Sequence, residues 1–157
     1  MATATQNYGA AANLTVTALH SLADDAFWQS DEQDNSVVKG FYAEVYVTIV
    51  TTTTVGDING VVNVRMAAGR ATGQLTGQLT GSEGSYADTA NLDHRHTTPV
   101  ASFSCDAVET TARTYKYRAI IHDLPEFFAL LIENKSGTGL ASSGNEVRVR
   151  IHKYDSS

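Results

Sequence analysis

The alternation of apolar and polar residues constrains this chain more than any other feature of its sequence. In residues 41–50, FYAEVYVTIV, every second residue is apolar: Phe41, Ala43, Val45, Val47 and Ile49. Successive side chains of a β-strand point to opposite faces, so this pattern is typical of a strand with one buried face. The same alternation predicts strands in GVVNVRMA, RTYKYRAIIH and NEVRVRIHKY.

One segment breaks the alternation. Residues 125–134, PEFFALLIEN, carry apolar side chains at consecutive positions, which fits a strand buried on both faces or a short helix. Pro125 before this run and the turn sequence NKSGTG after it favour the strand. The other helical candidate is residues 19–29, LHSLADDAFWQ, whose apolar spacing also fits a strand followed by a turn.

The predicted strands belong to one all-β domain. A chain of 157 residues has the length of a single domain, and 42% hydrophobic residues supply its core. Many β-branched residues, and breaks rich in Gly, Ser and Asn, favour antiparallel pairing over a βαβ arrangement. We predict a single antiparallel β-sandwich or jelly roll of about seven or eight strands over residues 1–157. It has an extended N-terminal arm at residues 1–13 and a long Gly/Thr-rich loop region at residues 69–99.

Residues 69–86, GRATGQLTGQLTGSEGSY, contain the tetrad TGQL twice. A phosphate-binding loop needs a Lys and then a Ser or Thr at the start of a helix, and here no Lys follows and no helix begins. The glycine spacing also excludes a dinucleotide-binding fingerprint. We interpret the segment as a long flexible loop between strands, of the kind that partners order in an oligomer.

His94 and His96 in the sequence DHRH are candidate metal ligands. In an extended segment both imidazoles point to the same side and could reach one ion. One chain supplies too few ligands for a closed site, whereas a trimer with both residues near its axis would surround the ion, as HxH pairs do at the tips of some phage tail spikes. A polar surface turn is the simpler interpretation, and we predict no metal site and no cofactor.

Acidic residues cluster in ADDAFWQSDEQDNS, residues 23–36. Carboxylates suit Ca²⁺, but the EF-hand order with its central Gly and terminal Glu is missing, which favours a solvated loop. Phe27 and Trp28, in the middle of this cluster, are either part of the core, which we favour, or an anchor for a partner.

Two pairs of tyrosines lie at alternate positions, Tyr42 with Tyr46 and Tyr115 with Tyr117. They could form a sugar-stacking face, as in carbohydrate-binding sandwiches. Filling the sheet interior or a subunit contact is the interpretation that we favour.

Charge and composition argue against several classes of function. The net charge of −6 removes the electrostatic attraction that dominates nucleic-acid binding. No apolar stretch approaches the roughly 18 residues of a membrane span, and no signal-peptide pattern is present, so we expect no membrane partner and synthesis in the cytoplasm. The single Cys105 cannot form an intramolecular disulfide. Neither a nucleophile elbow nor a distinctive carboxylate spacing occurs, and we predict that the protein is not an enzyme.

The C-terminal part of the chain, residues 119–154, resembles a group of small virion proteins of tailed double-stranded DNA bacteriophages. In that group Leu-Pro precedes an aromatic and aliphatic strand, followed by an Asn-x-Ser/Thr-Gly turn, a Ser-Gly-Asn stretch and a closing strand. The matching residues are Leu124, Pro125, 127–132, 134–137 and 143–145. The N-terminal order is similar too, with LTVTALHSLADDAFWQS leading into a long alternating strand over residues 37–53. Residues 69–99 depart from the pattern, because the group has a shorter polar segment there.

This resemblance implies a structural protein of the virion, a β-sandwich attached to the capsid as decoration or cement, or else to the tail. Icosahedral shells offer three-fold positions, so we expect a homo-oligomer, with a trimer favoured, that binds the major capsid protein or a tail protein. A free carbohydrate-binding sandwich is the alternative from another class. The candidate assembly contacts are Phe27, Trp28, Gln74, Leu75, Gln78, Leu79 and Tyr86.

Overall fold

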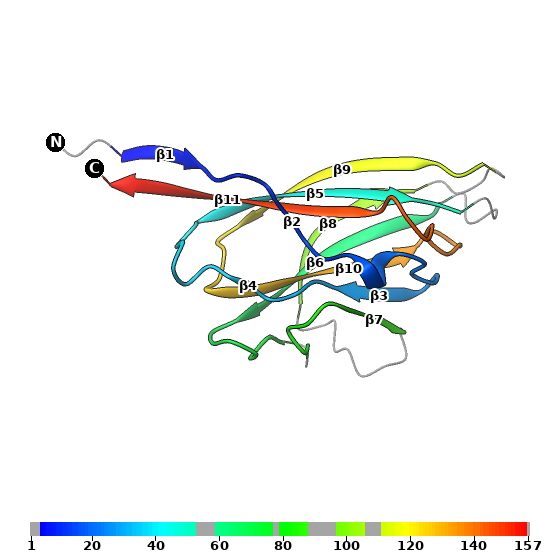
Figure 1. The fold of residues 1–157 in the computed structure, drawn as a ribbon, viewed down its shortest axis with the longest axis horizontal. Helices are drawn as coiled ribbons and strands as arrows, with labels where there is room; N and C mark the ends of the chain where they lie inside the picture. Colours follow the sequence, from blue (N-terminus) through cyan, green and yellow to red (C-terminus); the bar gives the residue numbers. More distant parts are fainter. Residues whose placement is uncertain (1–3, 53–58, 77–78, 88–96, 106–110, 157) are drawn as a thin grey trace.

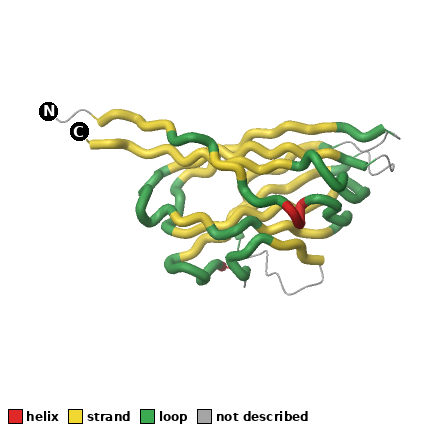
Figure 2. The backbone as a smooth tube through the Cα atoms, in the orientation of Figure 1, coloured by secondary structure: helices red, strands yellow, loops and turns green. Residues whose placement is uncertain are grey.

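The structure is a computed structural model that describes residues 4–52, 59–76, 79–87, 97–105 and 111–156. The helical element described in full is the single 3-10 turn η1 (Thr17–Leu19), and the other elements with described bounds are β-strands. The strands form two antiparallel sheets that pack face to face (Figures 1 and 2). The predicted all-β sandwich is therefore confirmed.

The two sheets are built mainly from strands distant in sequence. Sheet A has the order β1 (Ala4–Tyr8), β11 (Glu146–Ser156), β5 (Tyr42–Val50) and β9 (Thr114–His122), with the two-residue strand β2 (Ala12–Asn13) also paired with β11. Sheet B has the order β7 (Gly84–Ala87), β3 (Ala26–Gln29), β10 (Phe127–Lys135), β6 (Val61–Gly69) and β8 (Thr98–Ser104), with β4 (Gln33–Asp34) beside β10. The structure describes eleven strands, more than the seven or eight expected, and two of the additional ones, β2 and β4, are two-residue additions to longer neighbours.

The core lies between the sheets and follows the alternation in the sequence. One set of apolar side chains comes from every second residue of the strands of sheet A, and a second set from sheet B faces it. The buried members include Ala43, Val45, Val47, Ile49, Val147 and Val149 from sheet A and Trp28, Val62, Val64, Phe128, Leu130 and Ile132 from sheet B. Full burial of a Val, Leu, Ile or Phe side chain contributes about 1.5–3 kcal/mol to folding.

Residues 19–29 form neither a helix nor a strand followed by a turn. They form a turn followed by a strand, since η1 ends at Leu19 and β3 begins at Ala26. Asp25, immediately before β3, has a φ of 56°, a left-handed conformation that a regular helix does not contain. The apolar spacing arises because Leu19, Leu22 and Trp28 all reach the same core.

Strand β10 is buried on both faces, as its continuous apolar run predicts. Phe128, Leu130 and Ile132 point into the core between the sheets. Ala129 and Leu131 point to the opposite face of sheet B and are also buried there. Another part of the chain must therefore cover the outer face of sheet B.

Beyond the sandwich, β1 and the end of β11 form a two-stranded terminal ribbon. Their antiparallel register runs from Ala4 opposite Ser156 to Tyr8 opposite His152. Strand β5 pairs with β11 only as far as His152, so the part of β11 beyond it pairs with β1 alone. The ribbon projects from one end of the molecule and carries both ends of the described chain (Figures 1 and 2). Residues 4–8 and 12–13 of the predicted N-terminal arm are thus paired with the chain's own last strand.

Candidate assembly surfaces

The repeated TGQL tetrads provide the cover that sheet B requires. We use the name TGQL cover for the described residues between β6 and β7, which are 70–76 and 79–83. Leu75 and Leu79, one from each tetrad, are buried against Ala67, Ala129 and Leu131 on the outer face of sheet B. A β-bridge between Gly69 and Leu75 starts the cover. The segment predicted to be a flexible loop therefore packs on the sheet through its two leucines.

Acidic residues of the 23–36 segment hold the TGQL cover in place. The backbone N–H of Gly73 donates a hydrogen bond to the Glu32 carboxylate at 2.9 Å. The N–H of Glu32 in turn donates to the carbonyl of Gly81 at 2.9 Å, and the N–H of Glu83 donates to Asp31 at 2.8 Å. These carboxylates and backbone groups bind the chain itself, so this part of the acidic cluster is a fixed support for the cover.

Glu83 joins the TGQL cover to the core. Its carboxylate accepts the indole N–H of Trp28 at 2.8 Å and the backbone N–H of Ala18 at 2.6 Å. A buried indole N–H needs such an acceptor, because leaving it unsatisfied costs about 1–3 kcal/mol. Trp28 therefore fills the core while its only polar group fastens the end of the cover.

The predicted assembly contacts fall into three groups. Phe27, Trp28, Leu75 and Leu79 are buried within the chain itself, so in this conformation they do not offer their side chains to a partner. Gln74 is exposed, and the half-buried Tyr86 has its hydroxyl 3.1 Å from that of Thr80. Gln78 lies outside the described residues, as do His94 and His96.

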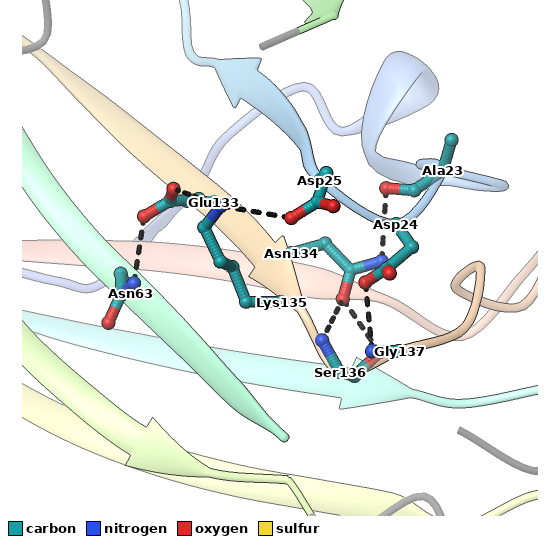
Figure 3. A network of polar contacts seen from close by, with 9 residues as sticks. All are labelled: Ala23, Asp24, Asp25, Asn63, Glu133, Asn134, Lys135, Ser136 and Gly137. Carbon is teal, nitrogen blue, oxygen red and sulfur yellow. Dashed lines mark hydrogen bonds and ion pairs between the residues drawn. The ribbon is translucent and has the colours of Figure 1, made fainter. Parts of the chain in front are cut away.

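A second polar network holds the end of β10 against the turn before β3 (Figure 3). The fully buried amide of Asn134 donates hydrogen bonds to the carbonyls of Leu22, Ala23 and Thr138. Its oxygen accepts hydrogen bonds from the backbone N–H and the hydroxyl of Ser136. Asn134 belongs to the Asn-x-Ser-Gly turn of the resemblance, and the geometry gives this turn a structural role.

Further contacts extend this network to the surface. Asp24 accepts the N–H of Gly137 at 2.8 Å, and Lys135 pairs with Asp25 at 2.9 Å and with Glu133 at 3.3 Å. Hydrogen bonding to Asp25 is the main cause of the raised pKa of Lys135. These groups satisfy one another, which is typical of a tied turn and not of a reactive site.

The outer face of sheet A carries a different kind of surface, which we name the arginine–tyrosine face. It consists of the outward residues of β5, β9 and β11, namely Tyr42, Glu44, Tyr46, Arg118, Ile120, Arg148, Arg150 and His152. Its centre is Glu44, whose side chain is only 9% exposed. The hydroxyl of Tyr46 donates to this carboxylate at 2.7 Å, and Arg118 donates to its other oxygen. Arg150 and His152 approach it at 3.6 and 3.3 Å.

This arrangement follows from strand register. Arg150 lies directly opposite Glu44 across the β5–β11 pair, and Arg148 lies opposite Tyr46. The hydrogen bond from Tyr46 is the largest cause that lowers the pKa of Glu44, from 4.5 to about 2. The same bond raises the pKa of Tyr46, because losing the phenolic proton would place two negative charges together. Glu44 is therefore ionised at neutral pH, and its carboxylate orients its neighbours.

The aromatic rings of this face are also held by their neighbours. The guanidinium groups of Arg148 and Arg150 lie 5.6 and 5.8 Å from the centre of the Tyr46 ring, within the range of cation–π attraction. Tyr42 stacks on His152 at 4.2 Å. By contrast, Tyr115 and Tyr117 pack toward the core, where Tyr117 stacks on Phe103. The two tyrosine pairs predicted together thus lie on opposite faces of sheet A.

Charge is divided unequally between this sheet and the rest of the molecule. Strands β5, β9 and β11 contain five Lys or Arg residues and three Asp or Glu residues, a net charge of +2 in a chain whose total is −6. The remainder of the chain therefore carries −8. Ile120 of β9, which lies opposite Glu44 of β5, is 43% exposed. The arginine–tyrosine face is thus a positive and partly apolar area on an acidic protein.

The alternation in NEVRVRIHKY and FYAEVYVTIV places these residues on the outside of the sheet, but it gives no reason to single them out. What makes them a site is the pairing of β5 with β9 and β11, which joins residues distant in the sequence, such as Glu44 with Ile120 and with Arg150. The available signal was the charge pattern, because Arg148 and Arg150 alternate with valines in an otherwise acidic chain.

Within the described ranges, no three His, Cys, Asp or Glu residues gather in a way that could hold a metal ion. Cys105 is buried, and none of the described helices is long and apolar enough to cross a membrane. The chain matches no protein-family model and no curated protein.

Proposed function

We propose that the protein is a non-enzymatic structural protein of a bacteriophage virion, a capsid decoration or cement protein that acts by binding alone. The observation that carries the proposal is the arginine–tyrosine face of sheet A. The resemblance of residues 119–154 to small virion proteins supplies the biological setting, and the β-sandwich agrees with it.

The composition of this face is that of a protein interface. Arg and Tyr are the residue types that most often carry binding energy, together with Trp. Here Arg148, Arg150 and Tyr46 hold one another before any partner arrives, since Glu44 and the cation–π contacts fix their positions. Side chains ordered in advance lose less conformational entropy on binding. The side chains of this face are therefore ordered before a partner binds.

Charge indicates what that partner offers. A positive area on an acidic protein attracts an acidic surface and repels the same area of another copy. The proposal therefore assigns the arginine–tyrosine face to an acidic area of the shell protein. In a tail-associated protein, the same face would bind an acidic area of a tail protein. Copy number distinguishes the two locations, because a shell protein is present in hundreds of copies per particle and a tail part in a few to dozens.

Reattachment to particles tests the proposal. Particles of the phage that encodes the chain are stripped of the protein, and the purified chain is added back and quantified by mass spectrometry. The double variant Arg148→Glu with Arg150→Glu is expected to lose at least tenfold in binding at low salt. The matched control, Lys39→Glu with Arg70→Glu, changes the same charge at exposed positions off this face and should bind like the wild type.

Two outcomes would contradict the proposal. Absence of the protein from purified particles would refute a virion role. Equal loss of binding in both double variants would show that total charge, and not the arginine–tyrosine face, controls attachment.

A further inference from the structure

The two sheets have open edges, and most of them carry protection against pairing with another chain. Unpaired edge strands invite added strands, and natural proteins block them with charges, proline, bulges or short length. In sheet B, β8 contains Pro99 and a register shift opposite Val64 and Arg65, and β7 has only four residues. In sheet A, β9 carries Lys116 and Arg118.

Strand β1 is the exception among the described edges. Its sequence, ATQNY, contains no charged residue and no proline, and its register with β11 has no irregularity. With five residues it is one residue longer than β7, and it lies on the terminal ribbon, which projects beyond the body of the sandwich where another molecule can approach (Figure 1). A two-stranded ribbon by itself is only marginally stable in water, so an added strand would stabilise it.

We propose that β1 of one copy pairs antiparallel with β1 of a second copy about a two-fold axis. Register over the five residues then places Gln6 opposite Gln6 of the second copy, Thr5 opposite Asn7, and Ala4 opposite Tyr8. The two copies of sheet A become one continuous sheet across the dimer. The proposal goes beyond the virion function, because it concerns the ribbon and leaves the arginine–tyrosine face available.

The absence of charged residues on β1 allows a second copy to occupy this edge. Two molecules that each carry −6 repel over most of their surfaces, yet pairing of β1 with itself brings no like charges opposite each other. The edge is self-complementary, since an antiparallel strand pair has two-fold symmetry, and contacts of this kind are the commonest in closed oligomers.

Cysteine cross-linking tests both the partner and the register. Directly opposed residues of an antiparallel pair have Cα atoms about 4.5–5.5 Å apart, within the range of about 4.4–6.8 Å that a disulfide spans. The variant Gln6→Cys should therefore form a disulfide-linked dimer on mild oxidation, while Thr5→Cys and Asn7→Cys should link poorly alone and well when mixed. Native Cys105 is buried and should not contribute. The control is Ser142→Cys, at an exposed turn, which should not link.

Light scattering coupled to size exclusion provides the second measurement. The wild type should have twice the chain mass of 16.8 kDa, and Gln6→Lys, which places two positive charges opposite each other, should shift it to the monomer mass. A wild type that is monomeric across the accessible concentrations, or an oligomer that Gln6→Lys leaves intact, would overturn the proposal. A trimer would overturn the two-fold pairing. None of these outcomes depends on whether the protein attaches to a virion.

Discussion

At the scale of single residues, two buried polar side chains hold the surfaces of the sandwich in position. Glu44 gathers Tyr46, Arg118 and Arg150 around one carboxylate, and Asn134 ties the end of β10 to the turn before β3. Removing Asn134 would leave several buried groups without partners, and removing the Glu44 carboxylate would take away the acceptor that Tyr46 and Arg118 share. The free energy lost in either case exceeds the net contribution of a single hydrogen bond.

The first prediction concerns Glu44→Gln, which should lower the free energy of unfolding by about 2 kcal/mol at pH 7. Because folding lowers the pKa of Glu44 from 4.5 to about 2, its stabilising contribution is complete above pH 4.5 and decreases as the pH falls toward 2. Urea denaturation of the wild type and the variant at several pH values measures this. Glu146→Gln, at a carboxylate that is 44% exposed, is the control and should change stability by less than about 0.5 kcal/mol. A difference that is independent of pH would contradict the prediction.

The second prediction compares the side-chain amide of Asn134, which is fully buried, with that of Asn63, which is partly exposed. Asn134→Ala should cost about 3 kcal/mol, since it leaves several buried groups unsatisfied at once. Asn63→Ala, on the neighbouring strand, removes one hydrogen bond to Glu133 and should cost less than about 1 kcal/mol. Thermal or urea unfolding of both variants is the measurement, and equal losses would show that the Asn134 network has no special weight.

At the scale of elements, the TGQL cover and β10 explain each other. The outward Ala129 and Leu131 of β10 need a cover, and Leu75 and Leu79 provide it. The cover has little regular structure, so its attachment depends on two leucines and a few hydrogen bonds to Glu32, Asp31 and Trp28. Such an element should open locally at a lower free energy than the strands beneath it.

The third prediction is that Leu79→Ala loosens the cover without unfolding the sheets. Trypsin should cut after the exposed Arg70 at least several times faster in the variant, and stability should fall by about 1–2 kcal/mol. Gln74→Ala, at an exposed position of the same cover, should cut like the wild type. Unchanged cleavage at Arg70 in Leu79→Ala would mean that the leucine does not hold the cover.

The sequence predicted strands far better than it predicted surfaces. Alternation located β5, β6, β9 and β11, and the double-sided run of residues 127–132 identified β10. The role of the TGQL cover was missed because two leucines separated by Gly, Thr and Gln match no strand or helix period. The need for a cover was nevertheless present in the outward Ala129 and Leu131. The arginine–tyrosine face depends on the register between distant strands, which no local pattern contains.

At the scale of the whole molecule, the sandwich has a positive outer sheet, an acidic remainder and a neutral ribbon. Each area suits a different contact, so two contacts can form at once without competing. Some of the acidic residues near β3 and β4 bind the TGQL cover, since Asp31 and Glu32 accept hydrogen bonds from its backbone. The arginines of sheet A also contact Glu44 and Glu146, but their side chains remain 37% to 57% exposed and can reach a partner.

The fourth prediction concerns the independence of the ribbon. Removing residues 1–7 should change the free energy of unfolding of the isolated chain by less than about 1 kcal/mol, because β1 pairs with the part of β11 from His152 onward, where the pairing of β5 with β11 ends. Urea denaturation at low protein concentration, where association is minimal, measures it. A loss of several kcal/mol would show that β1 supports the sandwich itself.

The pairing of Ala4 with Ser156 places the two ends of the described chain next to each other at the tip of the terminal ribbon. A few linking residues could close the chain into a ring there, and new ends could be opened at the exposed turn of residues 142–144 without cutting a strand. Such a circular permutant would keep both sheets. A peptide inserted next to Ala4 or next to Ser156 would project from the same tip of the ribbon. Either position would therefore suit the display of a fused peptide equally well.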